Sequence, residues 1–333
     1  MNFKRLVKSI IKHPGHKKAA HYALSLKLLV DRTQEIGKSD LLLFCTCRNE
    51  CARLPFFLDY YRKLGVDRFL FVDDDSSDGS VEFLSSQPDV SLWTTKASYR
   101  EANFGVHWLN FLLRKYGSGH WCLTLDPDEF LVIPHHGSRD LKELCAFLDS
   151  NKKESFFSIM IDMYPRGDVD LAVYNSGQDP LDVAPWFDPT GYYQERRPQG
   201  ECWIRGGVRR RVFFTENPED APALNKTVLV KWRKRYLYLA SAHLLSPFRL
   251  NEPHFPESLA PTGCLLHFKY LSLFLDKVQE ELVRKQHYAD SREYKRYADL
   301  LGTQTPMWCE GSVKYERWEQ FVDLGLMNTG RWF

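Results

Sequence analysis

The sequence has no apolar run approaching the ~20 residues that cross a bilayer, which argues against a membrane-spanning helix. Its net charge of +2 creates no field that favours nucleic acid, so we expect no nucleic-acid partner. Its eight cysteines lack the spacing of a disulfide framework, and no secretory signal precedes them. Internal repeats and low-complexity tracts are also missing. These absences predict a cytoplasmic protein with reduced thiols, and 333 residues at 44% apolar content suffice for a large core.

Three carboxylates stand between two apolar runs near the middle of the chain. Asp126, Asp128 and Glu129 follow residues 121–125 and precede residues 130–133. The pattern predicts a buried strand with a polar tip, followed by a second, short strand. Ligands of open α/β sheets collect at the carboxyl ends of strands, and carboxylates there suit Mg²⁺ or Mn²⁺. The alternative is a solvated turn, in which Asp and Pro are common.

The first half of the chain alternates predicted strands with predicted helices. The strands are residues 41–46, 68–72, 90–94 and 121–125, and the helices are residues 54–64, 81–84 and 103–116. This order predicts an α/β fold with a mostly parallel, Rossmann-like central sheet flanked by helices. Polar groups follow three of the strands, at residues 48–50, 73–78 and 126–129, so we expect them to converge on one crevice. A metal cation would relieve the repulsion between carboxylates crowded there.

Composition and predicted secondary structure divide the chain into four parts: residues 1–38, 39–135, 136–270 and 271–333. The first is a basic helical extension whose apolar face is short and broken at Pro14-Gly15. It could lie on an anionic membrane surface, but we favour a helix that packs on the body of the protein. The second part is the α/β half with the strand ends described above. The last is a C-terminal layer with predicted helices at residues 271–285, 293–301 and 313–324.

The third part, residues 136–270, carries further candidate site residues. A helix over 141–151 and a strand over 156–163 lead into a long loop, residues 168–200, whose aromatics suit stacking on sugars or simply pin the loop down. A strand over 205–214 would place Arg209 and Arg211 on one face. That face could bind a phosphate or carboxylate, or it could simply be exposed to solvent. Residues 227–232 and 236–240 predict a hairpin. A last strand, 263–270, carries His267 and Lys269, and a lone His there is usually a core residue.

The motifs taken together resemble those of bacterial family-two-like glycosyltransferases of the GT-A fold. The subgroup has an Arg-Asn-Glu strand end, a Val-Asp-Asp-x-Ser-x-Asp-Gly turn and an Asp-Pro-Asp-Glu-Phe motif. They stand here at residues 48–50, 72–79 and 126–130. The likeness runs from about residue 41 to the C-terminus. It implies an enzyme of polysaccharide biosynthesis that moves a sugar from a nucleotide-diphosphate sugar, most often UDP-linked, to a glycan or glycolipid hydroxyl with inversion. It also implies Mn²⁺ or Mg²⁺ and a place in the cytoplasm. Residues 1–38 lie outside the resemblance, and peripheral contact at the inner face of the membrane would follow if that segment lies on the membrane surface.

The resemblance also implies roles for individual residues. By this analogy Asp73 contacts the nucleotide base, and Arg48 and Glu50 line the same pocket. Asp126 approaches the ribose and the metal, Asp128 holds the metal, and His267 is a further metal ligand. The cations expected to neutralise the leaving diphosphate are Arg209, Arg211 and Lys269.

The general base is the least defined role, because the Glu-Asp pair common in such enzymes is missing from the expected region. The candidates are Asp188, Asp162 and Glu195, with Asp188 favoured by its Trp-Phe-Asp setting. A sugar-phosphate nucleotidyltransferase is one alternative function, although residues 47–53 lack the glycines of its triphosphate loop. A non-catalytic carbohydrate-binding relative is another, against which the intact Asp126/Asp128 pair argues.

Overall fold

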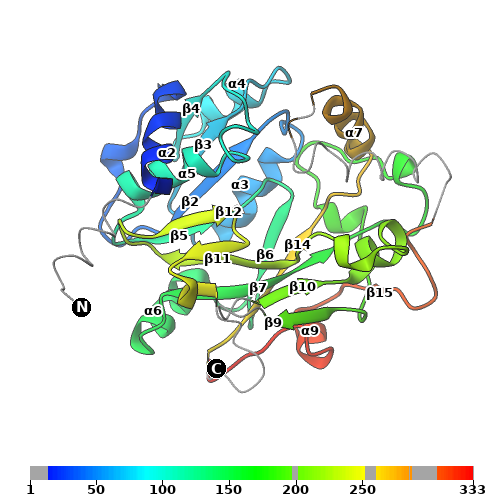
Figure 1. Ribbon diagram of the computed structural model, residues 1–333. Helices are drawn as coiled ribbons and strands as arrows, with labels where there is room; N and C mark the ends of the chain where they lie inside the picture. The colour runs from blue at the N-terminus through cyan, green and yellow to red at the C-terminus, as the bar shows by residue number, and fades with distance from the viewer. Residues whose placement is uncertain (1–13, 197–201, 252–259, 285, 287–305, 333) are drawn as a thin grey trace.

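A nine-stranded sheet forms the centre of the molecule (Figure 1). The computed structural model describes residues 14–196, 202–251, 260–284, 286 and 306–332. In spatial order the strands are β1 (Lys27–Val30), β4 (Val90–Thr94), β3 (Arg68–Asp73), β2 (Leu42–Cys47), β5 (Trp121–Thr124), β11 (Asn225–Lys231), β7 (Ser155–Asp162), β14 (Gly263–His267) and β6 (Glu129–Val132). All except β1, β6 and β11 run in one direction. The predicted α/β fold with a mostly parallel sheet is therefore confirmed.

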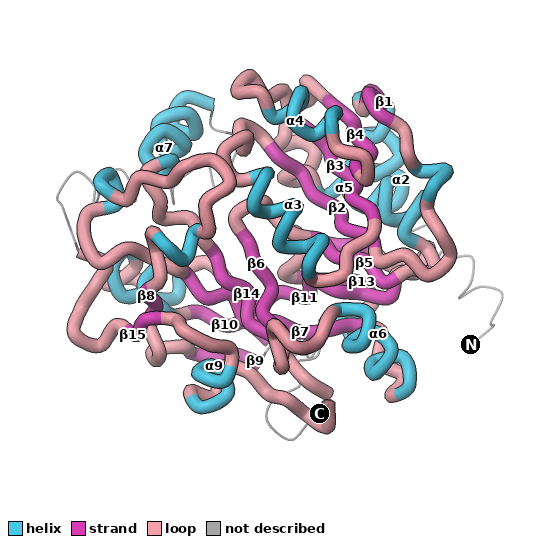
Figure 2. The backbone as a smooth tube through the Cα atoms, turned by 180° about the vertical axis from the view of Figure 1, so that it is seen from behind, coloured by secondary structure: helices cyan, strands magenta, loops and turns pink. Residues whose placement is uncertain are grey.

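Helices cover both faces of this sheet. They are α2 (Pro14–Tyr22), α3 (Leu54–Lys63), α4 (Ser80–Ser86), α5 (Val106–Leu112), α6 (Leu141–Ser150), α7 (Leu273–Arg284) and α9 (Glu319–Asp323). Helices α2 and α5 lie in front of the sheet in Figure 1, whereas α3 lies in front of it in the reverse view of Figure 2. Three two-stranded sheets lie outside the central one: β9 (Tyr193–Arg196) with β10 (Cys202–Arg205), β12 (Leu237–Ala240) with β13 (Leu244–Ser246), and β8 (Trp186–Phe187) with β15 (Val313–Lys314).

The local sequence explains the first half of the fold well. Strand β2 is apolar on both of its faces because helices cover both sides of the sheet, and all of it except Thr46 is buried. Helix α3 starts with Pro55 in its first turn and buries one apolar side that includes Phe57 and Tyr61. Gly65 follows this helix with φ +100°, a left-handed conformation that a residue with a Cβ rarely adopts.

The prediction of a continuous strand over 205–214 is wrong. Strand β10 ends at Arg205, and residues 209–213 form a single π-helical turn. Gly207 separates the two with φ +61°, which an extended strand cannot contain. On this turn the two arginines do not share a face: Arg209 is buried on Asp162, and Arg211 reaches Asp188.

The predicted hairpin of residues 227–232 and 236–240 is also wrong. Strand β11 inserts between β5 and β7 in the central sheet, antiparallel to both, and β12 pairs with β13 instead. The basic turn at 233–235 has the composition of a hairpin connection. Strand β11, however, is buried almost throughout and forms hydrogen bonds with β5 on one side and β7 on the other. Apolar strands pair wherever burial is greatest, which a local pattern does not encode.

The two ends of the chain agree with the predictions in part. Helix α2 packs on α5, with Tyr22 stacked on His107, and the following β1 pairs with β4, so residues 14–38 are not helical throughout. The predicted helix at 271–285 is present as α7, but residues 313–324 contain only β15 and the five-residue α9. The predicted helix at 293–301 lies outside the described residues, as do residues 1–13. In the part of the chain that the structure describes, no helix is long and apolar enough to span a membrane.

Candidate metal and nucleotide site

Strands β2, β3 and β5 end at the same edge of the sheet because they are parallel. Cys47 at the end of β2 lies beside Asp73 at the end of β3, and Asp126 follows β5 by two residues. The Asp73 side chain is fully buried, and its Oδ2 accepts a hydrogen bond from the Ser76 N–H at 3.0 Å. Its Oδ1 has no hydrogen-bond partner among the described residues. Asp73 therefore has an acceptor that a donor group of a ligand could satisfy, and its contact to a nucleotide base stays a prediction.

A second group of side chains lies where β6, β14 and β7 run next to one another. Register places His267 opposite Glu129 on one side and Asp162 on the other. Asp128 precedes β6, and its Oδ2 lies 3.4 Å from His267 Nε2. One ligand atom each of Asp128, Glu129 and His267 lies within 4.8 Å of the others. Two carboxylates and an imidazole at this spacing fit one divalent cation such as Mn²⁺. We refer to these three residues as the acidic cluster.

The second nitrogen of His267 is bonded inside the protein. Its Nδ1 lies 2.6 Å from Asp162 Oδ1. Arg209 clamps Asp162 through Nε at 3.1 Å and Nη2 at 2.5 Å. Burial by itself would raise the pKa of Asp162, but Arg209 and His267 outweigh it and hold that pKa well below its usual range. Burial likewise opposes the charged form of His267, yet the Asp128 and Asp162 carboxylates raise its pKa.

Lys226 on β11 reaches the acidic cluster, and the sequence analysis missed it. Its Nζ contacts the Glu129 carboxylate and lies 3.2 Å from Asp126 Oδ2, and only 3% of its side chain is exposed. Burial raises the pKa of Glu129 to about 7, with Lys226 opposing the rise. Asp126 itself is half-exposed and stands at the edge of this group. A lysine at the start of an apolar strand is a weak local signal, and its partners lie about a hundred positions earlier in the chain.

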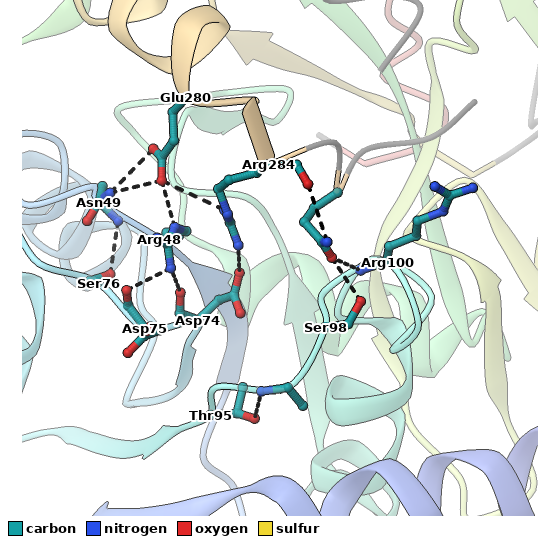
Figure 3. A network of polar contacts seen from close by, with 12 residues as sticks. Arg48, Asn49, Asp74, Asp75, Ser76, Thr95, Ser98, Arg100, Glu280 and Arg284 are labelled. Atoms are coloured by element: carbon teal, nitrogen blue, oxygen red, sulfur yellow. Dashed lines mark hydrogen bonds and ion pairs between the residues drawn. The ribbon is translucent and has the colours of Figure 1, made fainter. Parts of the chain in front are cut away.

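Helix α7 covers the ends of β2 and β3 through a separate polar network (Figure 3). Arg48 donates from Nε to Glu280 Oε1 at 2.8 Å and from Nη1 to the carbonyls of Asp74 and Asp75. Arg284, one helical turn after Glu280, donates to Asp74 Oδ2 at 2.8 Å. The sequence analysis predicted a helix here and named none of its residues as part of the site. The structure instead places two of its charged residues against the loop that follows Asp73.

The remaining predicted site residues lie outside the acidic cluster. Glu50 forms a buried ion pair with Arg53 at 2.7 Å. Asp188 accepts from the Tyr164 hydroxyl and from Arg211 Nε, the latter at 2.8 Å. Glu195 is exposed, and its Oε2 lies 3.1 Å from Arg205 Nη1. The Nζ of Lys269 lies 5.7 Å from the centre of the Phe274 ring. Of the three candidate bases, the structure brings Asp162 next to His267.

Comparison with known proteins finds a distant similarity to a glycosyltransferase. No protein-family model matches the chain. It is 23% identical over 239 residues to a glycosyltransferase family 92 protein of Ricinus communis, which covers 70% of this chain and 36% of that protein. The chain thus spans about a third of the length of the curated relative it matches.

Solved structures are more distant. The UTP-bound UGPase of Acinetobacter baumannii gives a TM-score of 0.31 at 11% identity, over 78% of this chain and 98% of that one. A 4-diphosphocytidyl-2C-methyl-D-erythritol synthase gives a TM-score of 0.25 at 15% identity, over 44% of this chain and 68% of that one. Likenesses this low carry no argument about activity.

Proposed function

We propose that this protein is a metal-dependent glycosyltransferase that moves a sugar from a nucleotide-diphosphate sugar, UDP-linked by preference, to a hydroxyl of a glycan or glycolipid. The observation that carries the proposal is the acidic cluster, whose two carboxylates come four and five residues after β5 and whose histidine ends β14 of the same sheet that holds the buried Asp73. The distant similarity to a family 92 glycosyltransferase supports it. Membership of the family-two-like subgroup and inversion at the anomeric carbon are part of the proposal.

Asp128 and His267 would hold Mn²⁺ or Mg²⁺, with Glu129 facing the same point. When bound, the cation would offset the negative charge that grows on the leaving diphosphate. We assign Asp126 a place beside the cation rather than on it, because its carboxylate is not among the ligand atoms that lie within 4.8 Å of one another. This departs from the expectation that Asp126 is itself a ligand.

The other groups act on the donor from the strand ends. Asp73 would accept a hydrogen bond from the base, and Arg48 would lie beside it at the end of β2. We assign neutralisation of the leaving diphosphate to Lys269, two residues beyond His267. Arg209 and Arg211 bind Asp162 and Asp188, and we assign them to positioning those two carboxylates. Asp188 or Glu195 would take the proton of the acceptor hydroxyl, although each is held by an arginine in this structure.

The place of the reaction is also proposed. An enzyme that elongates a surface polysaccharide from nucleotide sugars would work in the cytoplasm, at the inner face of the membrane. Peripheral contact would come from the basic residues that precede α2. Sedimentation with anionic vesicles, before and after removal of residues 1–13, tests this part, and unchanged partitioning would refute it.

Calorimetric titration with UDP, GDP, CDP and dTDP, each with and without Mn²⁺, tests the activity. We expect one nucleotide to bind, and only with the metal. No nucleotide binding with retained affinity for a glycan would favour the non-catalytic carbohydrate-binding alternative. Release of pyrophosphate from a nucleoside triphosphate and a sugar phosphate would favour the nucleotidyltransferase alternative.

A further inference from the structure

Asp162, His267 and Arg209 form a chain of contacts that ends at the acidic cluster. Strands β7 and β14 are parallel, and their register places Asp162 and His267 side by side. Both Asp162 oxygens are used, because Arg209 binds Oδ2 through Nε and Oδ1 through Nη2. The Asp162 side chain is completely buried, and that of Arg209 is nearly so. These side chains are therefore held in place before any ligand arrives.

The distances define which nitrogen of His267 carries a proton. Nδ1 and Asp162 Oδ1 are 2.6 Å apart, and two bare lone pairs at that distance would repel, so Nδ1 donates its proton to Asp162. Arg209 Nη2 also lies 3.1 Å from Nδ1, but a guanidinium has only donors and cannot accept that proton. In the neutral imidazole Nε2 then carries the lone pair. Nε2 is the nitrogen that faces Asp128, at 3.4 Å.

We propose that Asp162 and Arg209 are positioning residues, which fix His267 with Nε2 presented as a ligand to the cation, and that Asp162 is not the base that accepts the acceptor's proton. The assignment of a cation rests on the function proposed above, whereas the tautomer of His267 does not. A carboxylate that accepts the second N–H of a ligating histidine fixes the ring and raises its basicity. The Asp162 side chain is 0% exposed, against 9% for Asp188 and 57% for Glu195, and one of its oxygens is bonded to His267, which leaves it poorly suited to meet a substrate hydroxyl.

The first test uses the unmodified protein without metal. Nitrogen-15 NMR of the histidine side chains, at a pH where His267 is neutral, distinguishes the two tautomers. The His267 signal is assigned by its loss in His267→Asn. We expect Nδ1 to be protonated and Nε2 bare. A proton on Nε2 would overturn the proposal, whether or not the protein binds a metal.

The second test compares Asp162→Asn and Arg209→Lys with the control Asp149→Asn, an exposed carboxylate on α6 that pairs with Lys231. Mn²⁺ affinity is followed by electron paramagnetic resonance and turnover by nucleotide release. Loss of the hydrogen-bond partner of a ligating histidine typically weakens metal binding by about 10–100-fold, and we expect the upper part of that range for Asp162→Asn and the lower part for Arg209→Lys. Turnover at saturating Mn²⁺ should recover most of its value.

The opposite pattern would overturn the assignment. If Asp162→Asn binds Mn²⁺ as the unmodified protein does but loses turnover at every metal concentration, then Asp162 is the base. If the unmodified protein does not bind Mn²⁺ at all, the proposed function fails. The NMR measurement still decides the role of Asp162 toward His267 in that case.

Discussion

Replacing Lys226 with Met should destabilise the protein strongly, since it leaves the buried Glu129 without its cation. The Glu129 side chain is 1% exposed and contacts Lys226 Nζ, which also lies 3.2 Å from Asp126 Oδ2. Removing one partner of a buried ion pair typically costs about 3–5 kcal/mol, because the other charge stays desolvated. Methionine matches the lysine stem in volume, so little of the loss should come from packing.

Urea unfolding of Lys226→Met and of Lys231→Met makes the comparison. Lys231 lies on the same strand, but its ion pair with Asp149 is at the surface, where 36% of the lysine and 41% of the aspartate are exposed. Exposed pairs contribute about 0–1 kcal/mol, so the control should lose little. The double variant Lys226→Met/Glu129→Gln should regain much of the stability. Equal losses of unfolding free energy in Lys226→Met and Lys231→Met would refute the buried ion pair as a source of stability.

The pH dependence gives this prediction a second check. A buried Glu whose folded pKa exceeds the unfolded one destabilises the fold as pH rises above about 4.5, since the folded state keeps a proton that the unfolded state releases. Burial already raises the pKa of Glu129 to about 7 with Lys226 present. Without the ammonium the pKa rises further, so variant and wild type should differ in slope only above about pH 7. The gap in unfolding free energy should stay nearly constant from pH 5 to about pH 6.5 and widen from pH 7 to pH 8. A gap that does not widen above pH 7 would contradict this reasoning.

Three further predictions concern other parts of the molecule. Asp128→Ala should abolish Mn²⁺-dependent nucleotide binding in calorimetry while its circular dichroism stays unchanged; binding near the wild-type level would refute the metal assignment. Burial lowers the pKa of His243 to about 3, so protonation favours unfolding, and stability should fall by about 2 kcal/mol between pH 6.5 and pH 5. His243→Gln should flatten that slope in urea titrations. Glu280→Ala should remove the ion pair between α7 and Arg48. Because such a pair contributes about 1 kcal/mol, amide hydrogen exchange in α7 should become about fivefold faster. Unchanged exchange would show that α7 docks without this ion pair.

The order of elements in the first half of the chain was predictable because each segment carries its own signal. Apolar runs gave β2, β3, β4 and β5, and polar residues marked where they end. Parallel pairing then brought the ends of β2, β3 and β5 to one edge, as expected. Local patterns failed where a single residue changed the backbone. Gly207, with φ +61°, turned a predicted strand into a strand end and a helical turn.

The composition of the site was less predictable than its location. Asp128 and His267 were both named from motifs, and they lie together. Lys226 and Glu280 were not, because their partners lie about a hundred and more than two hundred positions away in the chain. Charge pairing between distant segments depends on which strands become neighbours. The insertion of β11 between β5 and β7, the pairing that the sequence analysis got wrong, is what brings Lys226 to the acidic cluster.

The position of β6 also affects the order in which the site can form during synthesis. β6 follows β5 after four residues, yet it lies at the far edge of the sheet, and its partner β14 emerges about 130 residues later. Contacts between such distant segments form late because a long loop must close first. A nascent chain ending before residue 263 can pair β2, β3, β4 and β5, but Glu129 and Asp128 have no histidine beside them. The chain therefore carries its motif long before it can assemble the proposed metal site, so a ribosome-bound fragment should acquire Mn²⁺ affinity only once β14 has emerged.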